Sequence, residues 1–184
     1  MTTVLDLTKE PPDEAELSGV QEILVHHGGE IDLPPLGAAP SLRSLRLNRA
    51  RVPDLSPLRD LPLERLSVTA RDGDLVSLAP HGTLRTLRLA SAGTPVSIAP
   101  LRDLPRLSGL DLTSAEVADL DVLADLDGLR YLAMRPDQWQ ASTPPPALAA
   151  ASLKGTVTLG AAIRWAVGLG GDTGNVVRHS GHVT

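Results

Sequence analysis

A six-residue phrase, L-x-x-L-x-L, recurs along this sequence of 184 residues. Its clearest copy is LRSLRL, in which Leu42, Leu45 and Leu47 hold the pattern. Copies with conservative replacements begin at residues 20, 42, 63, 84, 107 and 129, so the steps are 22, 21, 21, 23 and 22 residues. A fixed step of this length is typical of a chain built from stacked repeats.

A second phrase follows each of the first five starts by about a dozen residues. It reads DLPPL from Asp32, DLSPL from Asp54, DLVSL from Asp74, SIAPL from Ser97 and DLDVL from Asp119. Two phrases that keep the same phase over five repeats indicate one structural unit that is used again and again.

The first phrase predicts a short strand. Because side chains alternate along a strand, Leu45 and Leu47 point to one face, and Arg46 and Asn48 point to the other. One such unit cannot bury its own leucines, whereas stacked units can, which is how a solenoid folds.

The second phrase predicts a helical turn. Apolar residues recur every third position at Val52, Leu55 and Leu58, which is the period of a 3₁₀ helix. We expect Ser56 to cap this turn, with Pro57 at the first helical position.

Composition limits the other fold and partner classes. Apolar residues make up 42% of the chain but aromatic residues only 2%, which suits thin stacked layers. The net charge of −5 argues against nucleic acid or an anionic membrane as the main partner. The sequence has no Cys, no signal-peptide pattern at its start and no apolar run of membrane-spanning length, so we expect a cytoplasmic protein that is a monomer on its own.

The repeats resemble the leucine-rich repeat family, and their length and D-L-x-P-L phrase look most like internalins and SDS22-like proteins. The resemblance covers roughly residues 20–136. It implies an α/β solenoid with short parallel strands on a concave face and 3₁₀ or short helical turns on a convex face. The family's usual Asn or Cys at the ninth position is missing, because these positions hold Gly28, Ala50, Arg71, Ala92, Ala115 and Asp137. Other groups must therefore satisfy the backbone at the turns.

The ends of the array need caps, because terminal repeats would otherwise expose leucines. We expect an N-terminal cap over 1–19 with an edge strand at Leu5 and Leu7, about six repeats over 20–136, a C-terminal cap over 137–171 with a helix near 159–169, and a tail over 172–184. Tyr131, Trp139 and Trp165 lie towards the C-terminus. They cover the open end of the core in one interpretation and form a docking patch in the other.

The sequence offers little chemistry. It holds no G-x-S-x-G motif, no phosphate-binding loop and no pair of carboxylates at a spacing typical of a catalytic site. We therefore expect no enzymatic activity and no cofactor. His179 and His182 have a ligand-like gap without a carboxylate between them, so we expect no metal site.

The positions between the fixed leucines should form columns across the concave face, since neighbouring strands lie about 4.8 Å apart. The columns bring together Arg46, Asn48, Arg65, Arg88, Asp111, Tyr131 and Arg135, and Arg49 lies close by. These are the predicted partner-binding residues. The arginines suit a carboxylate-bearing partner segment, because a guanidinium group makes bidentate hydrogen bonds. Alternatively, this is a solvated face with a lateral pair between Arg88 and Asp111.

Two functions follow. The first is a non-enzymatic protein-binding module, such as an adaptor, a regulator or an immunity-type partner, that uses its concave strand face. The second is a structural subunit of a larger assembly that docks through its aromatic C-terminal region. The sequence leaves the identity of the partner open.

Overall fold

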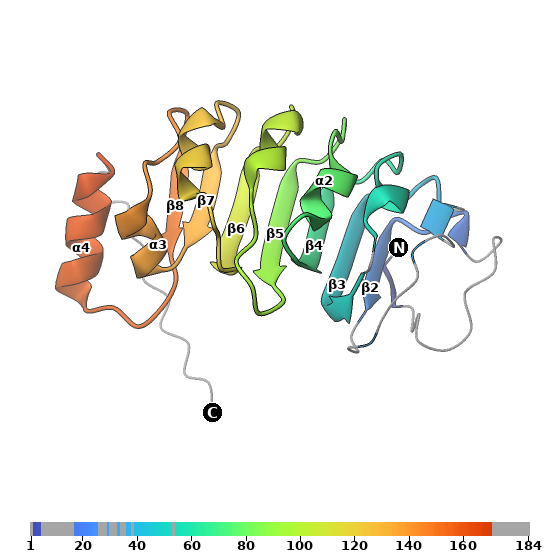
Figure 1. Cartoon of the computed structure of the whole chain (residues 1–184), viewed down its shortest axis with the longest axis horizontal. Coiled ribbons are helices and arrows are strands. Elements are labelled where there is room, and N and C mark those ends of the chain that lie inside the picture. Colours follow the sequence, from blue (N-terminus) through green and yellow to red (C-terminus); the bar gives the residue numbers. More distant parts are fainter. Residues whose placement is uncertain are drawn as a thin grey trace.

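The computed structural model describes residues 2–4, 17–25, 29, 33, 36–37, 39–52 and 54–170. These residues hold eight parallel strands in a single sheet, and each strand lies beside its neighbour in the sequence (Figure 1). The strands are β1 (Thr2–Val4), β2 (Glu22–Val25), β3 (Ser44–Arg51), β4 (Arg65–Ala70), β5 (Thr86–Ser91), β6 (Gly109–Ser114), β7 (Tyr131–Met134) and β8 (Ala150–Leu153).

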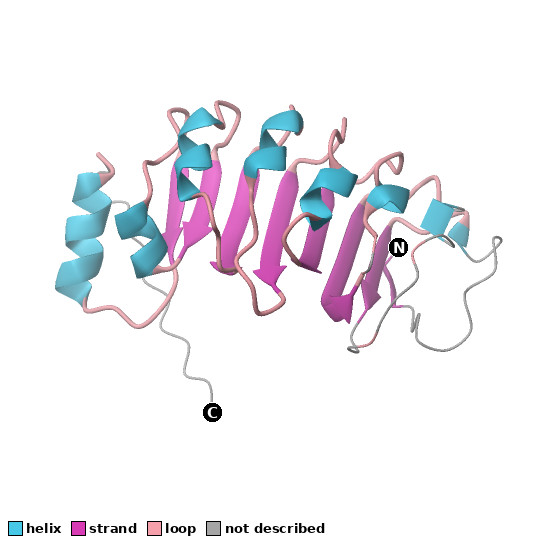
Figure 2. Cartoon of the chain, in the orientation of Figure 1, coloured by secondary structure: helices cyan, strands magenta, loops and turns pink. Residues whose placement is uncertain are grey.

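Short helical elements connect the strands and form a second layer over one side of the sheet (Figure 2). They are the 3₁₀ helices η2 (Ser56–Leu58), η3 (Ala99–Asp103) and η4 (Leu120–Asp125), and the α-helices α2 (Asp74–Leu78) and α3 (Pro136–Ala141). We call this side the helical face. The opposite side of the sheet, which was predicted as the concave face, is called the strand face. A further helix, α4 (Leu159–Gly168), follows β8 at the C-terminal end of the sheet (Figure 1).

The register of the sheet confirms the predicted repeat. Leu45 pairs with Leu66, Leu66 with Leu87, and Leu87 with Leu110. All four side chains are at most 2% exposed, so equivalent leucines lie in equivalent surroundings. The core is therefore a continuous apolar layer between the sheet and the helical turns, and the predicted α/β solenoid is the observed fold.

The sheet continues beyond the last predicted strand. β8 pairs in parallel with β7, and Leu148, Ala151 and Leu153 pack against the core as the three apolar positions of a further L-x-x-L-x-L phrase. This copy is hard to see in the sequence, because alanine replaces the middle leucine and three prolines precede it. At the other end, β1 pairs with β2. The predicted edge strand at Leu5 and Leu7 lies outside the described residues.

The capping of the second-phrase turns differs from the prediction. We expected Ser56 to cap its turn, but η2 begins at Ser56, and the N-cap residue is Leu55 without a side-chain hydrogen bond. The capping carboxylate is that of Asp54, which accepts hydrogen bonds from the Ser56 amide at 2.8 Å and from the Ser56 hydroxyl. The prediction was wrong because an Asp two residues earlier can form the same local turn.

The turn after β7 shows what replaces the missing asparagine of the family. Gln138 is 3% exposed, and its Nε2 donates to the carbonyls of Leu112 at 3.2 Å and Ala115 at 2.9 Å. The sequence analysis placed Asp137 at this position, one residue too early. A longer amide side chain therefore satisfies the backbone of the neighbouring repeat.

Two tryptophans pack together at the C-terminal end of the sheet. Trp139 is 8% exposed, and its Nε1 donates to the Ser152 carbonyl at 3.1 Å. Its ring lies 5.4 Å from that of Trp165 in an edge-to-face arrangement. Both rings contact the core, which favours the interpretation that they cover its end. Tyr131, in contrast, is on the strand face.

Candidate binding face

The strand face carries two rows of polar side chains. In the first row, Arg46 on β3 pairs in register with Ser67 on β4, which pairs with Arg88 on β5. In the second row, Arg65 lies on β4 between Ser44 and Thr86. Since neighbouring strands are about 4.8 Å apart, the Cα atoms of Arg46 and Arg88 are separated by about 10 Å. The fold therefore brings the three predicted arginines onto three adjacent strands.

Arg46 is tied to the strand on its N-terminal side. Its Nη2 lies 3.1 Å from Oε1 of Glu22 on β2. The Arg46 side chain is 53% exposed, whereas that of Glu22 is 20% exposed and also accepts a 3.5 Å hydrogen bond from Ser44. The guanidinium group of Arg46 therefore reaches solvent while its carboxylate partner lies against the sheet.

Arg88 is tied to the strand on its C-terminal side. Its Nε lies 3.7 Å from Oδ2 of Asp111 on β6, and Nζ of Lys154 lies 3.2 Å from the same oxygen. The other oxygen, Oδ1, accepts hydrogen bonds from the amide and hydroxyl of Thr113 at 3.0 and 2.6 Å. Burial raises the pKa of the Asp111 carboxyl, but the hydrogen bonds from Thr113 and Lys154 outweigh burial, so this pKa lies below its usual value.

Arg65 lies between these two ion pairs. Its side chain is exposed, and within the described part of the chain it has no hydrogen-bond or ion-pair partner. Ser67 beside it is half-buried and Thr86 is exposed. Among the described side chains, the centre of the strand face thus presents the free guanidinium group of Arg65, with the paired groups of Arg46 and Arg88 on either side.

The remaining predicted residues are placed differently. Tyr131 is 38% exposed in the same row as Arg65, three strands away on β7. Arg135 is turned towards the protein, because its Nη1 donates to the carbonyls of Thr113 and Ala115 and its Nη2 lies 3.2 Å from Asp137. The side chains of Asn48 and Arg49 lie outside what the structure describes, although both residues are in β3.

Lys154 belongs to the strand face but was not among the predicted residues. It follows β8 directly and reaches Asp111 across β7. Finding it from the sequence would have required recognising Leu148, Ala151 and Leu153 as one more copy of the repeat phrase. The strand face therefore extends further towards the C-terminus than the sequence analysis indicated.

The described residues contain no cluster of three or more His, Asp and Glu side chains that could hold a metal ion. In the same part of the chain, no helix is long and apolar enough to cross a membrane. His179 and His182, which were considered as metal ligands, lie outside the described residues.

Comparisons with known proteins give a likeness of structure only. No family model matches the sequence, and no curated protein matches it either. Among solved structures, internalin C2 from Listeria monocytogenes has 28% identity and a TM-score of 0.51 over 65% of this chain and 54% of its own. A second internalin from the same organism has 19% identity and a TM-score of 0.46 over 76% of this chain and 49% of its own. This chain thus spans about half the length of either one.

The repeat itself agrees with the likeness to the first of these structures. The phrase L-x-x-L-x-L recurs at a step of 21 to 23 residues, and its strands stack in register in one parallel sheet. The helical turns cover one side of this sheet and leave the other open (Figure 2). The observed fold is therefore that of a leucine-rich repeat solenoid.

Proposed function

We propose that this protein is a non-enzymatic protein-binding module whose strand face binds an acidic segment of a partner protein. Arg46, Arg65 and Arg88 are the central contacts of this binding face. Its role as an adaptor, a regulator or an immunity-type partner stays a prediction, as does its place in the cytoplasm.

The observation that carries the proposal is the exposure of three guanidinium groups on three adjacent strands. The side chains of Arg46 and Arg88 are 53% and 58% exposed, and Arg65 between them has no partner within the described chain. This happens in a chain with a net charge of −5, so the basic residues are not a consequence of overall composition. Guanidinium groups bind carboxylates in a bidentate manner, which makes an acidic segment the matching partner.

A triple variant tests the proposal. The protein with Arg46, Arg65 and Arg88 changed to Ser would be compared with wild type for binding a fluorescein-labelled octaglutamate peptide, measured by fluorescence anisotropy. We expect binding to weaken by at least ~1 kcal/mol for each charged hydrogen bond lost. Added salt should weaken the wild-type complex more than the variant complex, because it screens the charges that were removed.

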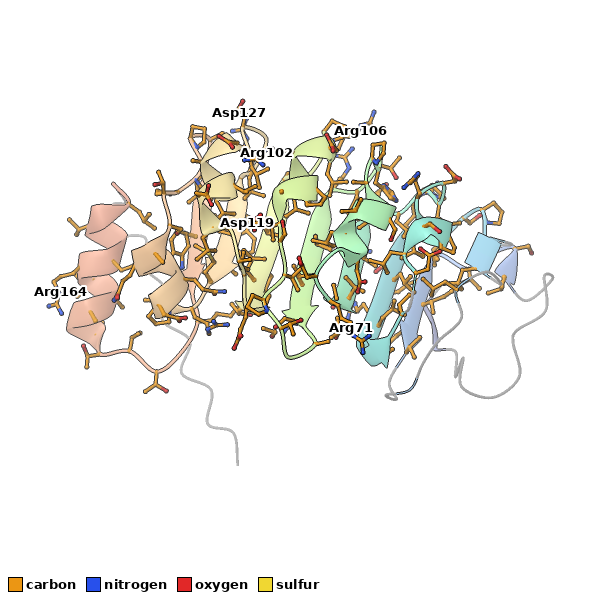
Figure 3. All side chains as sticks on the ribbon, in the orientation of Figure 1. Arg71, Arg102, Arg106, Asp119, Asp127 and Arg164 are labelled. Carbon is orange, nitrogen blue, oxygen red and sulfur yellow. The ribbon has the colours of Figure 1, made fainter. Side chains whose placement is uncertain are left out.

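The matched control changes three other exposed arginines to Ser. Arg71, Arg106 and Arg164 lie after β4, before β6 and on α4 (Figure 3), and their replacement alters the net charge by the same amount. Equal peptide affinity of the strand-face variant and this control, with both folded by circular dichroism, would exclude the arginine site.

The alternative function, docking as a subunit of a larger assembly, is favoured by one observation on α4. Leu159, Ile163 and Val167 lie four residues apart along this helix and are 53%, 39% and 55% exposed, so they form an apolar stripe on its outer side. Changing Ile163 to Asp should abolish assembly under this alternative and leave binding through the arginines unchanged. Co-purification from a native extract, followed by sizing of the complex, distinguishes the two.

A further inference from the structure

The strand face already contains a carboxylate for each outer arginine. Glu22 on β2 pairs with Arg46, and Asp111 on β6 pairs with Arg88. These carboxylates lie on opposite sides of the three-arginine group, so each ion pair ties its arginine to an outer strand. A carboxylate of a partner protein that approaches Arg46 or Arg88 therefore finds the arginine already paired with Glu22 or Asp111 of this chain.

The two internal ion pairs are suited to exchange. Their arginines are more than half exposed, and ion pairs of this kind contribute little to folding because water and salt screen them. Asp111 keeps its hydrogen bonds from Thr113 and its contact with Lys154 when Arg88 leaves. Glu22 likewise keeps its contact with Ser44. Each internal carboxylate therefore keeps a polar contact when its arginine pairs with a carboxylate of the partner.

Arg65 provides the starting point for such an exchange. It is exposed and unpaired within the described chain, and it lies between the two occupied arginines. A single carboxylate can bind to it without displacing anything. Further carboxylates of the same segment then bind to Arg46 and Arg88 only by displacing Glu22 and Asp111 from them.

We infer that Glu22 and Asp111 are internal competitors of the acidic partner, and that binding proceeds by carboxylate exchange at Arg46 and Arg88 after a first contact at Arg65. This inference rests on the proposed function of the strand face. It specifies the partner as a protein segment with several carboxylates, since one acidic residue would engage Arg65 alone.

The test removes the competing charges one at a time. Glu22→Gln and Asp111→Asn keep the shape of each side chain, and the amide that replaces the Asp111 carboxylate retains an oxygen that can accept the hydrogen bonds from Thr113. Each variant should bind octaglutamate about two- to fivefold more tightly than wild type, which is the range that exposed ion pairs contribute. Asp127→Asn is the matched control, because it makes the same change of net charge at an exposed residue in the turn between η4 and β7 (Figure 3).

A double variant separates local competition from a general change in charge. In a protein that carries Arg46→Ser, the change Glu22→Gln should bring no further gain in affinity, because its effect acts through Arg46. Unchanged or weaker binding by both Glu22→Gln and Asp111→Asn would overturn the inference, and so would a gain equal to that of Asp127→Asn.

The proposed function fails on a different result, namely equal binding by wild type and the triple arginine variant. Inorganic phosphate, titrated as a competitor of the peptide, identifies the kind of anion that binds. Displacement of the peptide at micromolar phosphate would overturn the assignment to a carboxylate-bearing segment, whereas retention of the peptide supports it.

Discussion

On the helical face, carboxylate and hydroxyl side chains accept hydrogen bonds from the backbone of the neighbouring repeat. On the strand face, carboxylates pair with exposed cations. Asp119 accepts from the amides of Ile98 at 2.8 Å and Ala99 at 3.2 Å, one repeat earlier. Asp111, only eight residues before it in the sequence, faces the strand side with Arg88 and Lys154.

The difference shows that residue type alone does not assign a role in this protein. A carboxylate that accepts a hydrogen bond from the backbone of the neighbouring repeat contributes to stability, since the Ile98 amide would otherwise lose its partner. A carboxylate that pairs with an exposed arginine contributes little to stability and is free to act in binding. Substitutions on the two faces should therefore affect different measurements.

The largest expected effect comes from the core that both faces share. Leu110 is fully buried, and its change to Ala should lower the free energy of unfolding by about 2–5 kcal/mol, because it removes apolar contacts and leaves a cavity. Urea denaturation followed by circular dichroism measures this loss. Thr86→Ala, at an exposed position on the neighbouring strand, is the control. A loss as small as that of the control would contradict the equivalent packing of the repeats.

The next effect tests the helical face. Asp119→Ala should lower the free energy of unfolding by ~1–3 kcal/mol, because the Ile98 amide loses its acceptor and the Ala99 amide keeps only the Ser97 hydroxyl. Asp127→Ala, which removes an exposed carboxylate nearby in the sequence, should change stability little. If the two variants unfold at the same urea concentration, the Asp119 carboxylate does not stabilise the fold, and the two faces do not differ in what their carboxylates contribute to stability.

A smaller effect is expected from pH, through His81 in the loop between α2 and β5. His81 is 1% exposed, its Nε2 lies 3.2 Å from the Leu58 carbonyl, and its Nδ1 accepts from the Leu84 amide at 3.2 Å. Burial holds the pKa of His81 below its usual value of 6.5, although the Leu58 carbonyl and Asp60 oppose this shift. The neutral ring is therefore the form that the folded state prefers.

The sign of the pH effect follows from this shift. Below pH 6.5 the unfolded chain binds a proton at His81 that the folded chain does not, so the free energy of unfolding should fall as the pH is lowered from 6.5 towards the lowered pKa. Urea denaturation at a series of pH values measures it. His81→Asn, which does not titrate, should be less stable near neutral pH and less sensitive to pH. An equal pH dependence of both proteins would assign the effect to other groups.

The smallest effect on stability should be that of Arg88→Ser on the strand face. Arg88 is 58% exposed, and Asp111 retains its contacts with Thr113 and Lys154 without it. We expect the free energy of unfolding to change by less than ~0.5 kcal/mol, as for ordinary surface substitutions. A clearly larger loss in urea denaturation would show that the strand-face ion pairs stabilise the fold, and would weaken their assignment to binding.

The sequence predicted the repeats well because they depend on a regular pattern of apolar residues. Spacing alone placed Leu45, Leu66 and Leu87 in one buried row, and it thereby placed Arg46 and Arg88 on the opposite face. It missed β8 and hence Lys154, because alanine at position 151 weakens the pattern although the strand still pairs with β7.

Local polar contacts were harder to predict. Ser56 and Asp54 are both good capping residues, and only the backbone geometry shows that the carboxylate of Asp54 is the acceptor. Similarly, Gln138 and not Asp137 donates to the Leu112 carbonyl. Adjacent residues of a helix point in different directions, so a prediction that is wrong by one residue selects the wrong side chain.

The sequence by itself determined the unit, its length and its apolar face, because the periods of strand and helix fix which side chains can be buried together. Only the tertiary structure decided the partners of the polar residues. Glu22 meets Arg46 and Lys154 meets Asp111 through stacking of strands that are distant in the chain. Burial of the leucines drives the stacking of the strands, and this force has no preference for which polar side chains become neighbours. The register of the sheet therefore decides which charged residues pair with each other.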